Sequence, residues 1–363
     1  MRHRRVILFS LFGVVIAVTV GLLLLWALGY SALEGYAYLL EYSLLSRTAL
    51  FSTLSRAALL VLLGLSASTA FASGALNLGQ SGQFLIGAMA ATVFGLFVNL
   101  PAFLQIPLSL AVAALAGMLY ASIAAFFRRR FNMNELIVTL MLNFVVDYFT
   151  QFLIAGPLFE EGRQSPASPA INASGWFPVY KGFDTGILVA LLAFILIYLL
   201  WNRSKTGYEW TIMGQNSIFS RIGGCPNEEN FTKAMLVSGA LAALAGALVI
   251  MGGIQHRFMP GIKANYADDG IMIAIVANNK VVATAIYAIM FAIMRTGAMG
   301  MELETGVPLE FVHVLTAITV LFVVASREYS QYLIDRFSAF LRARRISSRI
   351  EDYAGRDSSG SMD

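Results

Sequence analysis

The sequence predicts an all-α membrane protein with about ten transmembrane helices, an inverted repeat and two broken segments. Hydrophobic residues make up 58% of the 363 positions and charged residues only 13%, whereas a soluble domain carries about 25% charge. The net charge of +4 comes from basic residues that punctuate apolar runs instead of gathering on one face. This pattern is typical of a chain that crosses a bilayer many times, and it argues against nucleic-acid binding.

The spans come from apolar runs, since a helix needs ~20 apolar residues to cross a hydrocarbon core of ~30 Å. The first run follows a basic N-terminus and is longer than the apolar core of a signal peptide, so we favour an uncleaved span over a cleaved signal. The eighth run is short. The ten runs are 6–28, 57–74, 83–100, 106–127, 136–155, 185–201, 234–252, 270–279, 281–299 and 312–326.

The basic residues predict the orientation of these spans. With a cytoplasmic N-terminus, 18 of the 25 Lys and Arg residues fall inside, six fall outside and Arg295 lies within a helix. Lys and Arg concentrate on the cytoplasmic side of membrane proteins. Removing one span would put either the arginines at 128–130 or the basic tail outside, so we expect both termini in the cytoplasm.

The same assignment divides the chain into a transmembrane domain, 1–326, and a basic cytoplasmic C-terminal tail, 327–363. Two polar loops are long enough to have functions of their own. One is an outer loop at 156–184, which contains four prolines, and the other is a cytoplasmic loop at 202–233.

A first break interrupts the apolar pattern at 73–83. Three glycines lie there with Asn77, Gln80 and Gln83, which recur at spacing i, i+3, i+6 and would share one helix face. Irregular backbone at membrane depth is tolerated where it lines a wet cavity or is buried in protein. We therefore expect these amides to line a solute pathway; the alternative is that they hold helices together.

A second break covers 252–270, where glycines and Pro260 precede Asp268 and Asp269. In the predicted orientation, the helix before the first break runs inward and the helix before the second runs outward. Interrupted segments at matching places in oppositely oriented halves indicate an inverted repeat, with substrate passing near the breaks. Asp268 and Asp269 are therefore added to the candidate pathway residues.

The predicted span 136–155 also carries polar groups. Asn143 and Asp147 lie four residues apart in it, and therefore share one helix face. A carboxylate at the bilayer centre costs about 2.5–3.5 kcal/mol, so Asp147 should face the protein interior. It would line the pathway or, alternatively, serve packing. Arg295 should snorkel toward Asp268 or Asp269 in a structural role.

The sequence gives little support for a catalytic site or a metal site. The sequence has one cysteine, Cys225, and three scattered histidines, so we expect no metal site and no cofactor. A P-loop needs a Gly-Lys pair, and none of the five lysines follows a glycine. Any ATP must be hydrolysed by a partner, and the chain is not expected to be an enzyme.

Four stretches in order resemble motifs of one family, the permease subunits of bacterial ABC importers for simple sugars, nucleosides and branched-chain amino acids. Residues 76–83 (LNLGQSGQ) are similar to its N-[IL]-G-x-x-G-Q element, and 134–144 (NELIVTLMLNF) to a run typical of nucleoside-type members. Residues 213–223 with 238–246 resemble the cytoplasmic coupling loop and the following helix, and 269–275 resembles a G-I-A-V-A-L run. The chain departs from the pattern at 218–220, where alanines are usual, and at 277–281.

The resemblance implies a permease in the bacterial cytoplasmic (inner) membrane, surrounded by lipid. It implies three kinds of protein partner: cytoplasmic ATP-binding subunits, a second permease subunit, and an extracytoplasmic solute-binding protein. The 202–233 loop would dock the ATPase through a short helix with apolar anchors at helical spacing. The expected coupling residues are Gly214, Asn216, Ile218, Phe219, Arg221, Ile222 and Gly223.

The predicted function is import of a small neutral polar solute. The run at 134–144 favours a nucleoside, and a monosaccharide or riboflavin stays open as an alternative. An ion-coupled secondary transporter with Asp147 in its ion site is the second class of protein. It is disfavoured because other intramembrane carboxylates are few and the cytoplasmic loop is long. A membrane-embedded enzyme lacks any recognisable catalytic constellation.

Overall fold

The computed structural model describes residues 15–16, 18–252, 256–308, 310–311, 314–315, 317–318, 321–322 and 325. The chain divides into two compact units, one covering Glu34–Val307 and the other combining Met1–Leu33 with Pro308–Asp363. In the second unit an apolar helix covers Val18–Ala27. The start of the predicted span 6–28, much of 312–326 and the whole tail lie outside the described residues.

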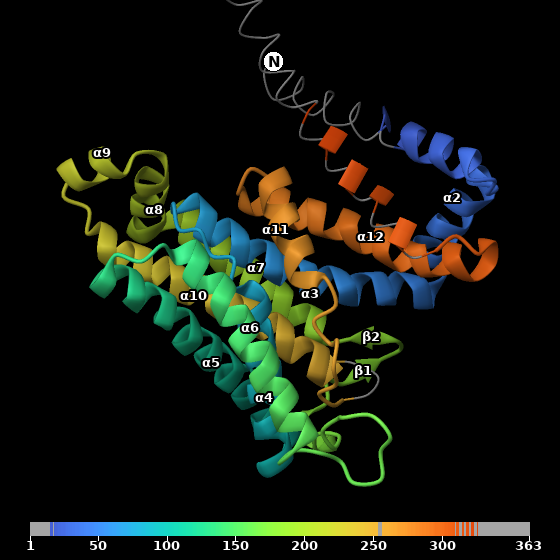
Figure 1. Cartoon of the computed structure of the whole chain (residues 1–363), viewed down its shortest axis with the longest axis horizontal. Coiled ribbons are helices and arrows are strands. Elements are labelled where there is room, and N and C mark those ends of the chain that lie inside the picture. The colour runs from blue at the N-terminus through green and yellow to red at the C-terminus, as the bar shows by residue number, and fades with distance from the viewer. Residues whose placement is uncertain are drawn as a thin grey trace, which may run out of the picture. The chain divides into compact units, whose positions relative to one another are not determined.

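The described part of the chain is helical apart from loops and one small hairpin (Figure 1). Seven of its helices are long and apolar enough to cross a membrane. They are α3 (Arg47–Ala72), α4 (Gln80–Phe97), α5 (Ala102–Phe131), α6 (Glu135–Ala155), α7 (Gly186–Arg203), α10 (Asn227–Gly252) and α12 (Val281–Thr305). Each overlaps one predicted span, while the count of ten and the inverted repeat stay predictions.

The remaining elements are short. Before α3 lie α2 (Ala32–Leu40) and a π-helix (Glu41–Leu45). The predicted outer loop contains a 3₁₀ turn (Ala173–Gly175) and an antiparallel hairpin of β1 (Val179–Tyr180) and β2 (Phe183–Asp184), paired Val179 with Asp184. The predicted cytoplasmic loop contains α8 (Lys205–Gln215) and α9 (Ser217–Ile222), and α11 (Tyr266–Val276) overlaps the eighth predicted span.

Helix α3 begins ten residues earlier than the apolar pattern predicted. The Ser46 side chain accepts a hydrogen bond from the Ala49 backbone N–H at 3.0 Å and caps the helix, so a polar first turn is stable there. With 26 residues, α3 is about 39 Å long at 1.5 Å per residue. It is therefore longer than the ~30 Å hydrocarbon core, and hydrophobicity alone could not find its polar end.

Helix α10 lies at the centre of the Glu34–Val307 unit and packs against α3, α4 and α5. Small residues permit this close contact. A Cβ added at Gly117 of α5 would lie 2.3 Å from the Gly239 carbonyl oxygen, and one at Gly239 would lie 2.5 Å from the Gly117 carbonyl oxygen. In lipid, where hydrophobicity does not drive helices together, such close approach favours helix association through van der Waals contacts.

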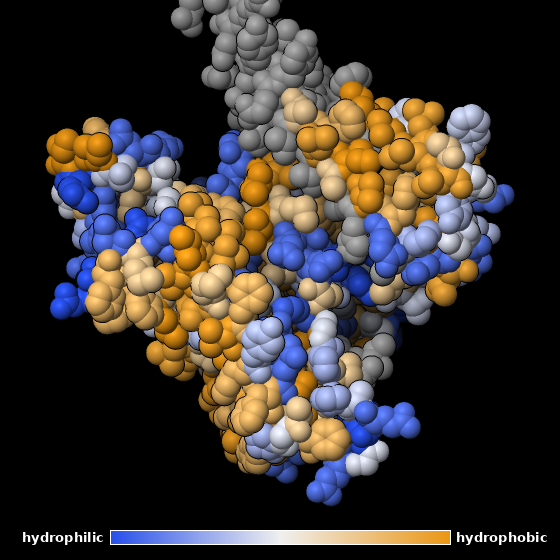
Figure 2. Space-filling view, in the orientation of Figure 1, coloured by the Kyte–Doolittle hydropathy of each residue, from blue (hydrophilic) through white to orange (hydrophobic). Residues whose placement is uncertain are grey.

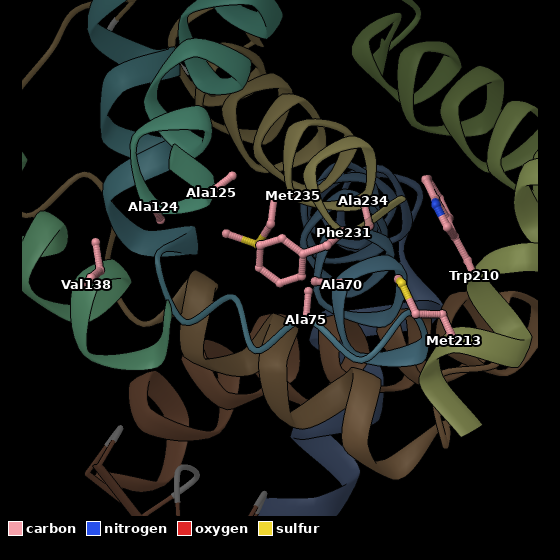
Figure 3. Packing of buried hydrophobic residues seen from close by; sticks show 10 residues of the cluster. All are labelled: Ala70, Ala75, Ala124, Ala125, Val138, Trp210, Met213, Phe231, Ala234 and Met235. Atoms are coloured by element: carbon pink, nitrogen blue, oxygen red, sulfur yellow. The ribbon is translucent and has the colours of Figure 1, made fainter. Parts of the chain in front are cut away.

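An apolar cluster attaches α8 to this bundle (Figure 3). Phe231 and Met235 of α10 lie at its centre, and Trp210 and Met213 approach from α8. Each large buried side chain contributes about 1.5–3 kcal/mol relative to exposure. Helix α8 is therefore held against the transmembrane helices instead of extending as a loose loop.

Candidate functional site

The first break is an ordered loop, 73–79, between α3 and α4. The chain turns at Gly74, whose φ of +80° suits glycine. Asn77 precedes α4, so the predicted helix face shared by Asn77, Gln80 and Gln83 is not present. The reason is that the Asn77 side chain accepts from the Gly79 backbone N–H at 2.9 Å, which stabilises a turn in place of a helix.

Hydrogen bonds between amides close this loop. Asn77 Nδ2 donates to Gln83 Oε1 at 2.9 Å, and Gln83 Nε2 donates back to Asn77 Oδ1 at 3.1 Å. Asn77 Nδ2 also donates to Ser238 Oγ of α10 at 2.8 Å. Both amides are almost completely buried. The loop is thus tied to α10 by uncharged polar groups.

Gln80 is the first residue of α4 and is also fully buried. Its Nε2 donates to Ser66 Oγ of α3 at 3.1 Å, whereas its Oε1 has no hydrogen-bond partner among the described residues. A buried acceptor without a donor is unfavourable and is uncommon in native structures. This oxygen is therefore a candidate acceptor for a solute hydroxyl or N–H, although the pathway role of all three amides stays a prediction.

The second break separates α10 from α11, and an ion pair lies at its end. The buried Asp269 carboxylate pairs with Arg295 of α12, whose guanidinium also lies over the Tyr266 ring, 4.9 Å from its centroid. The expectation that Arg295 reaches Asp268 or Asp269 is confirmed for Asp269. Asp268 is exposed.

Helix α6 contacts both breaks with the two polar residues that the sequence singled out. Asn143 Oδ1 accepts from the Gly82 backbone N–H at 2.8 Å, and its Nδ2 donates to the Leu78 carbonyl oxygen at 2.8 Å. One turn later, Asp147 pairs with Lys263 of the second break at 3.0 Å. Spacing i, i+4 places both groups on one face, so α6 connects the two broken segments.

In the loop predicted to be cytoplasmic, α8 and α9 form a helical hairpin at one end of the bundle (Figure 1). Asn216 caps α9, because its Oδ1 accepts from the backbone N–H groups of Ile218 at 3.1 Å and Phe219 at 2.9 Å. The exposed fractions of Ile218, Phe219 and Ile222 are 73%, 62% and 81%. Figure 2 shows apolar side chains at this corner of the molecule. The predicted short helix with apolar anchors is present.

The polar face of α9 turns inward and attaches the hairpin to α10. The buried Ser220 hydroxyl is 2.8 Å from Asn227 Oδ1, and Asn227 Nδ2 donates to the Ser217 carbonyl oxygen at 2.9 Å. Asn230 of α10 donates to Glu209 of α8 at 2.8 Å, and this bond, followed by the nearby Lys205, lowers the pKa of Glu209. The carboxylate is therefore charged at neutral pH.

A polar groove of about 480 Å³ lies where α9, α5, α10 and the first break meet. Arg221 and Gln215 border it, and Gly223 is the C-cap residue of α9. Arg128 of α5 pairs there with Glu135 at 2.7 Å and covers the Phe231 ring at 3.9 Å. Arg128 thereby joins α5 to α6 and α10 beside the groove that α9 borders.

Comparison with known proteins decides which family has this arrangement. Residues 49–324 match the family model described as "Branched-chain amino acid transport system / permease component". The chain belongs to this permease family. It is therefore a multi-pass transport subunit of an ABC transporter, associated with ATP-binding and substrate-binding components, and it is not an enzyme.

Three relatives resemble this permease over most of its length. The guanosine ABC transporter permease protein NupP of Bacillus subtilis is 31% identical, with 88% of this chain and 93% of the relative covered. The glucose ABC transporter permease protein TsgB13 of Haloferax volcanii is 30% identical, with 88% of each chain covered. The nucleoside ABC transporter permease protein NupB of Lactococcus lactis is 28% identical, with 88% and 91% covered.

Several contacting residues were not found from the sequence. Ser66 and Ser238 bind the amides of the first break, and their hydroxyls lie 3.0 Å apart inside apolar helices. Lys263, the partner of Asp147, lies 116 positions away in the second break. A polar residue within an apolar run was the available signal for the serines, whereas nothing local indicated the pairing of Lys263.

Proposed function

We propose that this permease imports nucleosides across the bacterial cytoplasmic membrane, driven by ATP hydrolysis in soluble partners. The observation that carries the proposal is α9, a capped helix that exposes Ile218, Phe219 and Ile222 while its other face is bonded to α10. A small apolar helix face outside the membrane has the form of a peptide that inserts into a groove of another protein. In an ABC transporter, the ATPase subunits are the soluble partners that could supply this groove.

The hairpin can transmit force because it is attached to the bundle at several points. The Phe231 and Met235 cluster, the bond from Asn230 to Glu209 and the Asn227 contacts join it to α10, which also binds Asn77 of the first break. Closure of an ATPase dimer would move α9, and with it the elements around this break. Nucleotide would then shift the population between inward-open and outward-open states.

The proposed substrate class rests on the chemistry of the first break and on the similarity to nucleoside permeases. Two of the similar permeases carry names for guanosine or nucleoside transport, one is named for glucose, and a weaker relative for riboflavin. The amides of the first break are uncharged and suit a neutral solute with several hydrogen-bonding groups. The likeness to the nucleoside transporters favours nucleosides over sugars.

An ion-coupled transporter is less well supported. Asp147, which would hold the ion, is already paired with Lys263 at 3.0 Å. A cation would have to displace this ammonium group. The exposed apolar face of α9 also has no use in a transporter without a soluble motor.

Reconstitution tests this function directly. The complete complex in proteoliposomes, with the solute-binding protein outside, should accumulate labelled guanosine only when ATP is enclosed, and protonophores or sodium ionophores should not abolish uptake. Unlabelled uridine should compete, whereas glucose and riboflavin should not. Uptake without ATP that collapses with an ionophore would refute ATP coupling, and competition by glucose alone would refute the nucleoside assignment.

A further inference from the structure

A second cavity lies at the predicted outer side of the Glu34–Val307 unit, toward the end with β1 and β2 (Figure 1). Its volume is about 470 Å³, within the range of ~300–1,000 Å³ for small-molecule sites. The N-terminal turns of α3, the hairpin, the start of α7, the end of α10 and the start of α11 enclose it. It is separate from the amide network of the first break, which lies at the other end of α3.

One face of α3 supplies three hydroxyl groups to this cavity. Thr48, Ser52 and Ser55 have spacing i, i+4, i+7, so they lie along a single stripe of the helix. Below them the lining becomes apolar, and it includes Leu59 and Leu248. The cavity thus combines hydrogen-bonding groups on one wall with an apolar floor.

Two charged groups border the same space. Arg56 Nη2 donates to the Met299 sulfur at 3.1 Å, and because a thioether is a weak acceptor, the guanidinium retains donors for a better one. On the opposite wall, Asp184 Oδ1 accepts from the Gly186 backbone N–H at 2.7 Å. Burial raises the pKa of this carboxyl group, which makes a further donor favourable there.

Aromatic rings complete the lining. Phe51 lies on α3 with its edge against Phe183 of β2, at a centroid distance of 5.9 Å. Tyr266, at the start of α11, has its ring under the Arg295 guanidinium that pairs with Asp269. A flat ligand group in contact with Tyr266 would therefore touch the second break through a chain of direct contacts.

We propose that this cavity is an outer solute site within a single permease subunit, and that it binds a neutral molecule with a flat ring and several hydroxyl groups. Phe51, Tyr266 and the apolar floor would take the ring. Thr48, Ser55 and Asp184 would bind ligand hydroxyls, and Arg56 would donate to a ring carbonyl. The Asp184 carboxylate disfavours an anionic ligand, and the polar wall disfavours a lipid chain. The choice of a nucleoside as this molecule rests on the function proposed above.

Protection of an introduced cysteine tests the site without measuring transport. Ser52, exposed at the cavity, is changed to cysteine in a Cys225→Ala background of the complete complex in nanodiscs, and a charged maleimide reports its reactivity. At guanosine near ten times the dissociation constant, mass action leaves about one site in ten free, so labelling should slow about tenfold. The matched control is Ser165→Cys, an exposed serine of the outer loop away from the cavity, whose labelling should not change.

A cavity-filling variant gives a second test of the site. Ser55→Trp combined with Ser52→Cys should abolish the guanosine-dependent protection, whereas Ser165→Trp combined with Ser52→Cys should keep it. An unchanged Ser52→Cys labelling rate at saturating guanosine, in a complex that still takes up guanosine with ATP, would overturn the cavity while leaving the proposed function intact. Protection by glucose but not by guanosine would overturn the flat-ring ligand class.

Discussion

Gly214 of α8 lies directly against Gly74, which begins the turn of the first break. A Cβ added at Gly74 would lie 3.3 Å from the Gly214 Cα atom, and one added at Gly214 would lie 2.0 Å from the carbonyl oxygen of Ala72. Backbone therefore contacts backbone where the hairpin of α8 and α9 reaches the end of α3. Because no side chain intervenes to absorb movement, a displacement of α8 must displace the break as well.

Gly214→Ala should uncouple ATP hydrolysis from transport. A methyl group 2.0 Å from a backbone oxygen cannot be accommodated, so α8 must shift away from α3, at a cost typical of overpacking, about 1–3 kcal/mol. We expect the ratio of solute transported to ATP hydrolysed to fall severalfold in proteoliposomes.

The control for this variant is Gly175→Ala in the outer loop, where the added Cβ would lie 3.4 Å from Ile171, an ordinary contact. That variant should transport with the normal ratio. If Gly214→Ala also keeps the normal ratio, the contact with Gly74 does not transmit movement.

Phe219→Ala should weaken docking of the ATPase. Interface energy concentrates in a few large side chains, and the loss of one anchor costs about 2 kcal/mol or more, close to a thirtyfold loss of affinity. Because Phe219 is exposed and its removal leaves no cavity, the stability of the permease should not change. Tyr180→Ala, which removes an exposed aromatic residue of the outer hairpin, is the matched control.

Copurification measures the affinity, and crosslinking locates the contact. A cysteine at position 219 should capture the ATPase in at least one nucleotide state, while solute binding by the external protein stays normal. A cysteine there that captures no ATPase in any nucleotide state would mean that α9 is not the docking helix.

Gln80→Leu and Gln83→Leu separate the two interpretations of the first break. If the amides contact solute, either change should reduce uptake while the amount of assembled complex stays normal. If they serve packing alone, Gln83→Leu should mainly destabilise the fold, by roughly 1–3 kcal/mol, since the Asn77 side chain would lose its buried partner. Uptake per assembled complex, together with the thermal midpoint, distinguishes these outcomes.

The membrane helices could be predicted because hydrophobic runs and basic residues are local signals. Each of the seven long apolar helices overlaps a predicted span. Elements whose stability depends on capping could not be found this way. The polar first turns of α3 needed the Ser46 cap, and the turn at Asn77 needed the hydrogen bond that the Asn77 side chain accepts from the Gly79 backbone N–H.

The polar residues of the site could be singled out from the sequence, but their contacts could not. Asn143 and Asp147 were identifiable as polar groups in an apolar helix, yet their partners lie at Leu78, Gly82 and Lys263. Pairings over such separations depend on how helices are arranged in space. Asp269 and Arg295 are an exception, because charges that are costly in a membrane have few possible partners.

The buried Asp269–Arg295 pair should be strongly destabilised by removing one charge. Asp269→Asn leaves a buried guanidinium without its counter-charge, and breaking such a pair costs about 3–5 kcal/mol. The double variant Asp269→Asn with Arg295→Met should recover much of this loss, since a neutral pair needs no compensation. Thermal unfolding in detergent measures both, and equal stability of the single and double variants would argue against coupling between these residues.

Membrane topology connects these assignments, because the docking helix must face the cytoplasm and the outer cavity must face away from it. The basic residues predict that position 170 lies outside and position 350 inside, with 18 of the 25 Lys and Arg residues on the inner side. In a Cys225→Ser background, Ala170→Cys should react with an impermeant maleimide in intact spheroplasts, and Ile350→Cys should react only after the membrane is opened. Neither residue belongs to a proposed site, so both variants should retain uptake. Labelling of both cysteines from the same side would contradict the five spans predicted between positions 170 and 350, and would require either α9 or the outer cavity to be reassigned.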